Sequence, residues 1–231
     1  MPLDLKSRLV GRGDFENLEG VRTDSPTMDI EGHSLIFSFA ASNKIEIKSA
    51  DISNAYFQGK ELDRILLLRP PKGGLPDPDY ADGETMILAR VPIYGTPDAG
   101  RFFWKQFKET IEDATFKENT TLRALYGCVD RTGNIQALLG THVDDMMWAA
   151  VKDVEHQVQK ILDHFDCRKI EKGEFRFCGK EVKQFADFSI KVTCKDTSEK
   201  VELIMFTKNG RKMTERGSEH EIGQMRSVIG S

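Results

Sequence analysis

The chain has 231 residues, of which 39% are hydrophobic and 30% charged, a balance that is ordinary for a folded globular protein and argues against disorder. No apolar run approaches the roughly 20 residues that a membrane-spanning helix needs, and Met1 to Lys6 lack the apolar core of a signal peptide. We therefore expect an intracellular protein, and its net charge of −4 does not favour binding of nucleic acid through a basic surface.

The cysteines show no pattern typical of metal ligands. No Cys-x-x-Cys spacing occurs among them, so a zinc site is not expected and reduced, partly buried thiols are. The four positions are Cys128, Cys167, Cys178 and Cys194.

The first helix is expected from Asp29 to Asn43, after a polar stretch, residues 1–28, that predicts a short strand and a loop. Asp29 suits the position that caps a helix, and Asn43 suits its end. Apolar side chains recur at helical spacing: Leu35, Ile36, Phe39 and Ala40. His33 has no second histidine near it in sequence, which favours a surface position over a role as ligand.

The next segments predict strands. Polar and apolar residues alternate from Lys44 to Ala50, and Asp51 follows this strand directly. Residues 65–68 and 85–91 predict two more strands, which are separated by a loop rich in proline, glycine and aspartate.

A second helix is expected from Asp98, a possible cap, to about Ala114. Its apolar stripe indicates core packing: Phe103, Phe107 and Ile111. Two strands follow, at 125–130 and from Ile135 on, and the glycine and asparagine between them suit a tight reversal.

Two adjacent acids, Asp144 and Asp145, lie between two apolar segments that predict a buried hairpin, 135–141 and 146–151. Aspartate also favours turns for local reasons, so this pair alone does not indicate a function. Asp51 adds a third acid at the end of another strand, which we expect to lie beside the hairpin. Three carboxylates at two strand ends can hold a divalent metal ion.

The last elements are a helix and three strands. Asp153 suits the cap of a helix with clean apolar spacing, formed by Val154, Val158, Ile161, Leu162 and Phe165. Strands are expected at 174–182, 189–194 and 201–206. The whole order indicates an α+β fold with an antiparallel sheet backed by helices on one face.

Several motifs stand in an order that resembles the reverse transcriptase of copia-type long-terminal-repeat retrotransposons. They are Ala50–Gly59, then Tyr94-Gly95 leading to Arg101 and Trp104, then His142–Asp145. Weaker matches to the same family are Lys6–Asp14, Ser25-Pro26, Arg69–Gly73 and Phe177–Glu181, so the resemblance spans nearly the whole chain.

The resemblance implies one reverse transcriptase region over residues 1–231, cut short at its C-terminus, with fingers and a palm built on a ferredoxin-like core. The fingers would be residues 1–44 and 60–92, and the palm residues 45–59 and 93–185. Residues 186–231 would form the palm edge and the start of the connection toward the thumb.

The resemblance also implies an RNA-directed DNA polymerase, which adds deoxynucleotides to a primer 3′ end by two-metal-ion phosphoryl transfer. Asp51, Asp144 and Asp145 would be the catalytic residues and would hold two Mg²⁺ ions, with Mn²⁺ as a substitute. The partners would be an RNA or DNA template-primer, deoxynucleoside triphosphates, and the thumb, RNase H and integrase regions of a Pol polyprotein. The resemblance implies a cytoplasmic location, in the virus-like particles of the family, or a nuclear one.

Other site residues are also implied by the resemblance. Tyr56 matches the aromatic gate that excludes a ribose 2′-hydroxyl, although an ordinary core aromatic is the plain alternative. The positions that match nucleotide-binding residues are Lys6, Arg8, Arg12 and Arg101. The positions that match primer or template contacts are His142, Trp104, Phe177 and Gly179.

The sequence departs from the family pattern at two places, and the first of them, together with the missing thumb region, favours a second interpretation. Thr96–Gly100 replaces the family's Leu-Lys-Gln-Ala-Pro stretch, and His142 stands where the family has tyrosine. The alternative is a non-catalytic, retrotransposon-derived remnant that keeps the fold and binds at most nucleic acid or a protein. A metal-dependent hydrolase that uses His142 is less favoured, because a single histidine makes no motif.

Overall fold

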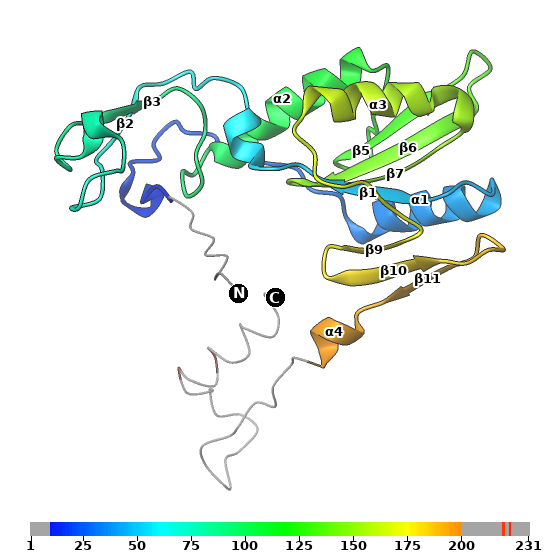
Figure 1. Cartoon of the computed structure of the whole chain (residues 1–231). Helices are drawn as coiled ribbons and strands as arrows, with labels where there is room; N and C mark the ends of the chain where they lie inside the picture. Colours follow the sequence, from blue (N-terminus) through cyan, green and yellow to red (C-terminus); the bar gives the residue numbers. More distant parts are fainter. Residues whose placement is uncertain (1–9, 200–218, 220–221, 223–231) are drawn as a thin grey trace, which may run out of the picture.

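A computed structural model describes residues 10–199, 219 and 222, and it shows the mixed helices and antiparallel sheets of an α+β protein (Figure 1). A six-stranded sheet with helices forms the larger part, and β2 and β3 lie in a smaller part beside it. Within this described range, none of the helices has the length and apolar character required to cross a membrane.

The six-stranded sheet has the order β4-β5-β6-β7-β1-β8, and every neighbouring pair is antiparallel. Its strands are β1 (Lys48–Asp51), β4 (Lys117–Glu118), β5 (Leu125–Val129), β6 (Ile135–His142), β7 (Asp145–Ala150) and β8 (Glu171–Lys172). The expected pairing of the Asp51 strand with the acidic hairpin is confirmed, because β1 pairs with β7.

The central strands are apolar at consecutive positions because the sheet is buried on both faces. Successive side chains of a strand point to opposite faces. Accordingly, Leu139 and Met146 enter one core cluster, whereas Leu138 and Met147 enter the other.

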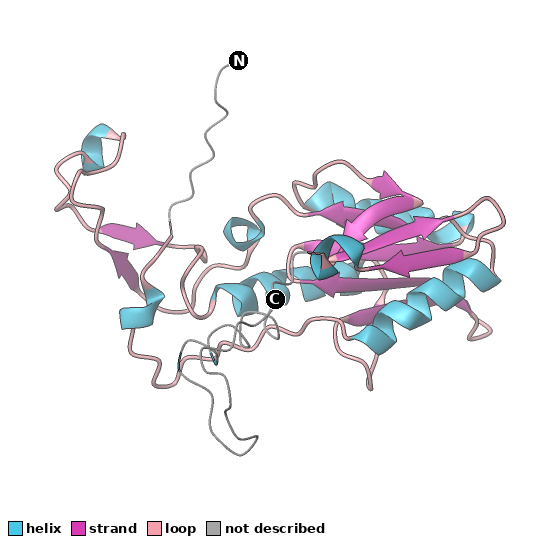
Figure 2. Ribbon diagram, turned by 90° about the horizontal axis from the view of Figure 1, so that it is seen from below, coloured by secondary structure: helices cyan, strands magenta, loops and turns pink. Residues whose placement is uncertain are grey.

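Helices cover both faces, so the prediction of helices on one face only is wrong (Figure 2). Helices α2 (Ala99–Asp113) and α3 (Glu155–His164) pack on the first core through Phe103, Phe107 and Ile161. Helix α1 (Ile30–Ser42) packs on the second through Ile36 and Ala40, while Leu35, expected on its buried face, is exposed. The continuous apolar runs of β6 and β7 require this double cover.

The helix starts show which capping predictions hold. The Asp29 carboxylate accepts a hydrogen bond from the Gly32 N–H at 3.0 Å, so its role as cap of α1 is confirmed. Asp98 and Asp153 do not cap with their side chains. Asp98 instead binds an arginine, and Asp153 lies in the 3-10 helix Lys152–Val154 that precedes α3.

A three-stranded sheet packs on the second core beyond α1: β9 (Glu174–Phe177), β10 (Lys180–Gln184) and β11 (Ile190–Thr193). The single strand expected at 174–182 is therefore a hairpin. Cys178 and Gly179 form its turn, with φ of 48° and 74°, and two such residues in succession reverse a strand tightly. The short helix α4 (Lys195–Ser198) follows, and the strand expected at 201–206 lies outside the described residues.

The smaller part contains the two-stranded sheet of β2 (Leu66–Leu68) and β3 (Ile87–Ala89), as expected. Its remaining elements are 3-10 helices, η1 (Gly13–Phe15) and η3 (Pro78–Tyr80), and η2 (Ala55–Gln58) links it to the large sheet. No strand is found in the described residues 10–28, although one was expected early in the chain. Within this range, the N–H groups of Gly11 and Gly13 donate to the carbonyl oxygens of Tyr94 and Gly95.

Candidate active site at the β1–β7 edge

The three acids predicted to act together gather at one end of two paired strands. Asp51, the last residue of β1, faces Asp145, the first residue of β7, in the antiparallel register. Asp144 lies in the turn before β7, and its carbonyl oxygen accepts the Ile52 N–H at 2.9 Å. Val143 opens this turn with φ of 57°. We call this group of Asp51, Asp144 and Asp145 the acid edge.

The carboxylates of the acid edge repel one another. The pKa of Asp145 is raised to about 6, first by burial and then by the charges of Asp144 and Asp51. Burial also raises the pKa of Asp51, against the effect of Arg168, and Asp144 raises it further. A cation placed among these groups would offset both the cost of burying the charged carboxylates and their mutual repulsion.

Arg168 pairs with Asp51 of the acid edge. The Arg168 guanidinium binds the Asp51 carboxylate at 2.9 Å, and the Arg168 backbone N–H donates to the Asp51 carbonyl oxygen at 2.8 Å. A polar cavity of about 270 Å³ opens beside this pair. It is lined by three acids, three basic residues and a serine: Asp51, Asp145, Glu171, Arg168, Lys169, Arg176 and Ser49.

The donor chemistry of the acid edge fits a hard divalent cation, because carboxylate oxygens are the ligands that magnesium prefers. The side chains, however, are not arranged as a complete metal site. No group of three or more His, Cys, Asp or Glu within the described range is placed so that it could hold a metal ion. The role of Asp51, Asp144 and Asp145 as metal ligands therefore stays a prediction.

Tyr56 lies in η2, five residues beyond Asp51. Its ring is partly buried, packs against the first core and lies 4.7 Å from the ring of Tyr94. Asn54, with φ of 48°, starts η2, which packs against α2. The tyrosine is thus supported from two sides and is not enclosed by the core.

The arginines expected to bind nucleotide are engaged by acids of the same chain. Arg12 pairs with Asp14 at 2.8 Å, and both side chains are exposed. Arg101 pairs with Asp24 at 2.6 Å. Lys6 and Arg8 lie outside the described residues. Arg12 and Arg101 are therefore neutralised by acids in this structure.

The residues expected to contact primer or template differ in exposure. His142 is exposed at the end of β6, opposite Asp145, and Gly179 lies in the β9–β10 turn. The Trp104 ring on α2 lies between the cations of Arg101 and Lys108, at 5.8 and 5.4 Å. Phe177 is buried, 1% exposed, so its side chain supports the hairpin from within and does not face a ligand.

Two features of the site carry no signal in the sequence. The expectation that His33 lies at the surface is wrong, because the β9–β10 hairpin covers this part of α1 and leaves His33 only 5% exposed. The ring meets Phe177 edge-on at 5.3 Å and lies 3.3 Å from the Lys180 ammonium. The contact joins residues 147 positions apart, which no local spacing predicts.

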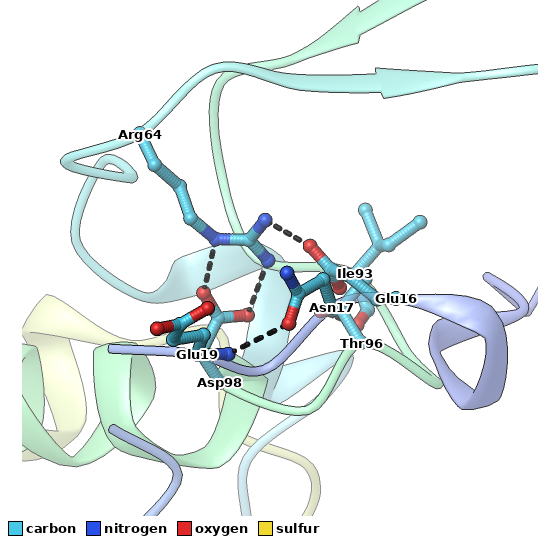
Figure 3. A network of polar contacts seen from close by, with 7 residues as sticks. All are labelled: Glu16, Asn17, Glu19, Arg64, Ile93, Thr96 and Asp98. Atoms are coloured by element: carbon cyan, nitrogen blue, oxygen red, sulfur yellow. Dashed lines mark hydrogen bonds and ion pairs between the residues drawn. The ribbon is translucent and has the colours of Figure 1, made fainter. Parts of the chain in front are cut away.

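The second feature is an ion-pair network at the start of α2, shown in Figure 3. Arg64 donates to both carboxylate oxygens of Asp98, at 2.7 and 3.1 Å, and also contacts the Glu16 carboxylate. The Asp98 side chain is only 1% exposed. These contacts raise the pKa of Arg64 and join three segments distant in sequence, one of them Thr96–Gly100.

Comparison with known proteins agrees with these motifs. The family described as "Reverse transcriptase (RNA-dependent DNA polymerase)" matches residues 3–214. The chain is 24% identical over 183 residues, 78% of its length, to a retrovirus-related Pol polyprotein from transposon RE2 of Arabidopsis thaliana. It is 27% identical over 146 residues, 62% of its length, to the one from transposon TNT 1-94 of Nicotiana tabacum. The matched regions are 12% and 10% of these two relatives.

Proposed function

Because the chain belongs to the reverse transcriptase (RNA-dependent DNA polymerase) family, we propose that the acid edge is a polymerase active site. The reaction would add deoxynucleotides to a primer 3′ end on an RNA template. The observation that carries the proposal is the pairing of Asp51 with Asp145 across β1 and β7, with Asp144 beside them. This pairing brings Asp51 to the same end of the sheet as Asp144 and Asp145, which lie 93 or more residues further along the chain.

The division into fingers and palm is part of this proposal. The six-stranded sheet with α2 and α3 would be the palm, and the β2–β3 part would belong to the fingers, with boundaries as the family resemblance implies. Helix α1, which that division assigns to the fingers, packs against β6 and β7. We therefore assign α1 to the palm.

The acids would hold two magnesium ions, which manganese could replace. Bound magnesium supplies charge neutralisation for the attacking and leaving oxygens of phosphoryl transfer. The chain's own part is to supply Asp51, Asp144 and Asp145 at fixed strand ends and to release Asp51 from Arg168. Tyr56, supported by Tyr94, would lie under the sugar of the nucleotide as a gate against ribonucleotides.

The substrates would be deoxynucleoside triphosphates and a template-primer. The relatives are Pol polyproteins of transposons, so the natural context proposed is a longer polyprotein with thumb, RNase H and integrase regions.

A non-catalytic remnant is the second candidate, and one observation favours it. Arg12, Arg101 and Arg168 each pair with an acid of the same chain, so they offer less charge to a phosphate backbone. Such a protein would keep the fold without the reaction.

Primer extension on an RNA template separates the two candidates. We expect magnesium-dependent extension by the chain, and its loss in Asp51→Asn and Asp144→Asn. The matched control is Asp153→Asn, an exposed acid before α3 that caps nothing, which should leave extension unchanged. Extension that survives both active-site substitutions would refute the mechanism. A chain that neither extends primers nor responds to magnesium in its melting temperature would be the remnant.

A further inference from the structure

The side-chain amide of Gln58 joins two segments that lie far apart in sequence. Its Nε2 donates to the carbonyl oxygen of Ser53 at 2.5 Å, and its Oε1 accepts the Asp166 N–H at 2.8 Å. A glutamine amide has a donor end and an acceptor end, and both are used here, so the orientation of the side chain is fixed. Gln58 is half-buried and is the last residue of η2, whereas Asp166 lies 108 positions further along the chain.

The segment that Gln58 reaches is itself paired with the end of β1. The Ser53 N–H donates to the Asp166 carbonyl oxygen at 2.7 Å. The Arg168 N–H donates to the Asp51 carbonyl oxygen at 2.8 Å. Gln58 therefore ties η2 to a segment that is held against the acid edge by backbone hydrogen bonds.

On its other side, η2 is held by helix α2. A Cβ on Gly59, the residue after η2, would lie 3.0 Å from the backbone nitrogen of Phe103, which is tighter than ordinary van der Waals contact. The next N–H, that of Lys60, donates to the Phe102 carbonyl oxygen at 3.2 Å. The C-terminal end of η2 is thus held by α2 on one side and through Gln58 on the other.

Tyr56 lies inside this short turn, two residues before Gln58. The turn, Ala55–Gln58, is a 3-10 helix, in which the internal hydrogen bonds have poorer geometry than those of an α-helix. The Tyr56 ring lies 4.7 Å from the ring of Tyr94 and packs against the first core, but it is only partly buried. The direction of the ring therefore depends on how the backbone of η2 is held.

We propose that Gln58 is the positioning residue of the Tyr56 gate, because its two hydrogen bonds hold η2 so that the Tyr56 ring excludes the 2′-hydroxyl of a ribonucleotide. The inference rests on the proposed function, in which Tyr56 lies under the nucleotide sugar. Exclusion by a steric clash requires a wall that does not yield. A displacement of about 1 Å in a positioned group can change a rate by about 100-fold. Since Gln58 acts only through Tyr56, its loss should alter selectivity more than catalysis.

The first test compares a deoxynucleotide with the matching ribonucleotide in single-nucleotide extension of a primer on an RNA template by the full chain. Gln58→Met keeps the length of the side chain and removes both hydrogen bonds. We expect the ratio of kcat/KM for the deoxynucleotide to kcat/KM for the ribonucleotide to fall about tenfold, the size of effect that one or two lost hydrogen bonds produce. The kcat with the deoxynucleotide should change little. The matched control, Gln159→Met, breaks an exposed amide bond to Asp163 within α3 and should leave the ratio unchanged.

The second test asks whether Gln58 acts through Tyr56. Tyr56→Ala removes the ring and should itself lower the ratio. Adding Gln58→Met to Tyr56→Ala should then cause no further fall, because the side chain that Gln58 positions is gone. A general effect on the fold would instead reduce extension with both nucleotides, whether or not the ring is present.

A binding measurement gives the same comparison without reaction. On a primer that lacks its 3′ hydroxyl, the Kd of the ribonucleotide should fall in Gln58→Met, whereas the Kd of the deoxynucleotide should not. Melting temperature checks the fold of each variant. If Gln58→Met does not fold, Gln58→Glu takes its place, because the carboxylate keeps an acceptor for the Asp166 N–H and loses the donor to Ser53; the ratio should fall in this variant too.

The inference is overturned if the folded Gln58 variant keeps the ratio of the unsubstituted chain, or if Gln58→Met lowers the ratio further in Tyr56→Ala. It is also overturned if Tyr56→Ala leaves the ratio unchanged. The proposed polymerase activity would stand in all three cases. A chain that extends the primer with neither nucleotide would overturn the proposed function together with this inference.

Discussion

The acid edge and the Arg64 network are both partly buried groups of charges, and they differ in whether each acid has a basic partner. In the network, Asp98 and Glu16 share the Arg64 guanidinium, so each buried charge has a partner. At the acid edge, the exposed Arg168 pairs with Asp51, whereas the pKa of Asp145 is raised to about 6 by burial and by the neighbouring acids. Removing one partner from the network would therefore leave an unpaired buried charge, whereas the acid edge costs stability that a bound cation would restore.

The largest expected effect comes from breaking the ion pairs of the Arg64 network. Asp98→Ala leaves Arg64 without its bidentate partner in a largely buried position, which should lower the free energy of unfolding by about 3 kcal/mol. Urea denaturation measures this change. The control is Asp14→Ala, which breaks an exposed pair and should cause no resolvable change. Equal effects of the two substitutions would show that the network has no special structural role.

The next substitution should raise the free energy of unfolding, because it removes repulsion between carboxylates. Asp145→Asn should raise the free energy of unfolding of the metal-free protein at neutral pH by about 1 kcal/mol, a value that allows for solvent screening of a partly exposed group. The same substitution should abolish primer extension. A less stable Asp145→Asn protein would mean that the carboxylate makes favourable contacts that outweigh the repulsion.

The pH dependence of stability tests whether the charge of Asp145 causes this effect. The pKa of Asp145 is raised from 3.8 to about 6. Between pH 3.8 and about pH 6, the folded state therefore binds more protons than the unfolded state. Asp145 should therefore destabilise the fold above about pH 6, and this penalty should disappear as the pH falls toward 4. We expect the stability difference between Asp145→Asn and the unsubstituted protein to shrink over this range. A constant difference would exclude titration of Asp145 as its source.

The smallest expected effect concerns Arg168. Arg168→Gln removes the partner of Asp51, but the Arg168 side chain is 62% exposed, so the loss of stability should be about 0.5 kcal/mol. Affinity for magnesium should rise, because the guanidinium no longer competes for Asp51. Melting curves at increasing magnesium concentration measure both quantities. Weaker magnesium binding in Arg168→Gln would indicate that the arginine orients Asp51 and does not compete.

Local patterns in the sequence predicted much of the fold. The apolar spacing and Asp29 predicted α1, and the Phe103, Phe107 and Ile111 stripe predicted the buried face of α2. The acidic hairpin and its pairing with the Asp51 strand were also predicted. These features depend on residues close in sequence or on a motif whose acids must meet.

The errors concern contacts between distant segments. The turn at Cys178-Gly179 divides an expected strand; its signals in the sequence are Gly179 and the change of apolar phase from Phe175 and Phe177 to Val182. His33 is buried only because that hairpin folds back over α1. Asp98 suits a helix cap in sequence, yet its carboxylate binds Arg64, 34 residues away, because a buried charge gains more from an ion pair.

The most direct test of the account is the melting temperature of the metal-free protein as magnesium is added. The unsubstituted chain and Asp98→Ala should both show a saturable rise, because both keep the acid edge, whereas Asp145→Asn should show little or none. Equal rises in the unsubstituted chain and in Asp145→Asn, or no rise in either, would contradict the claim that the acid edge is built to receive a divalent cation.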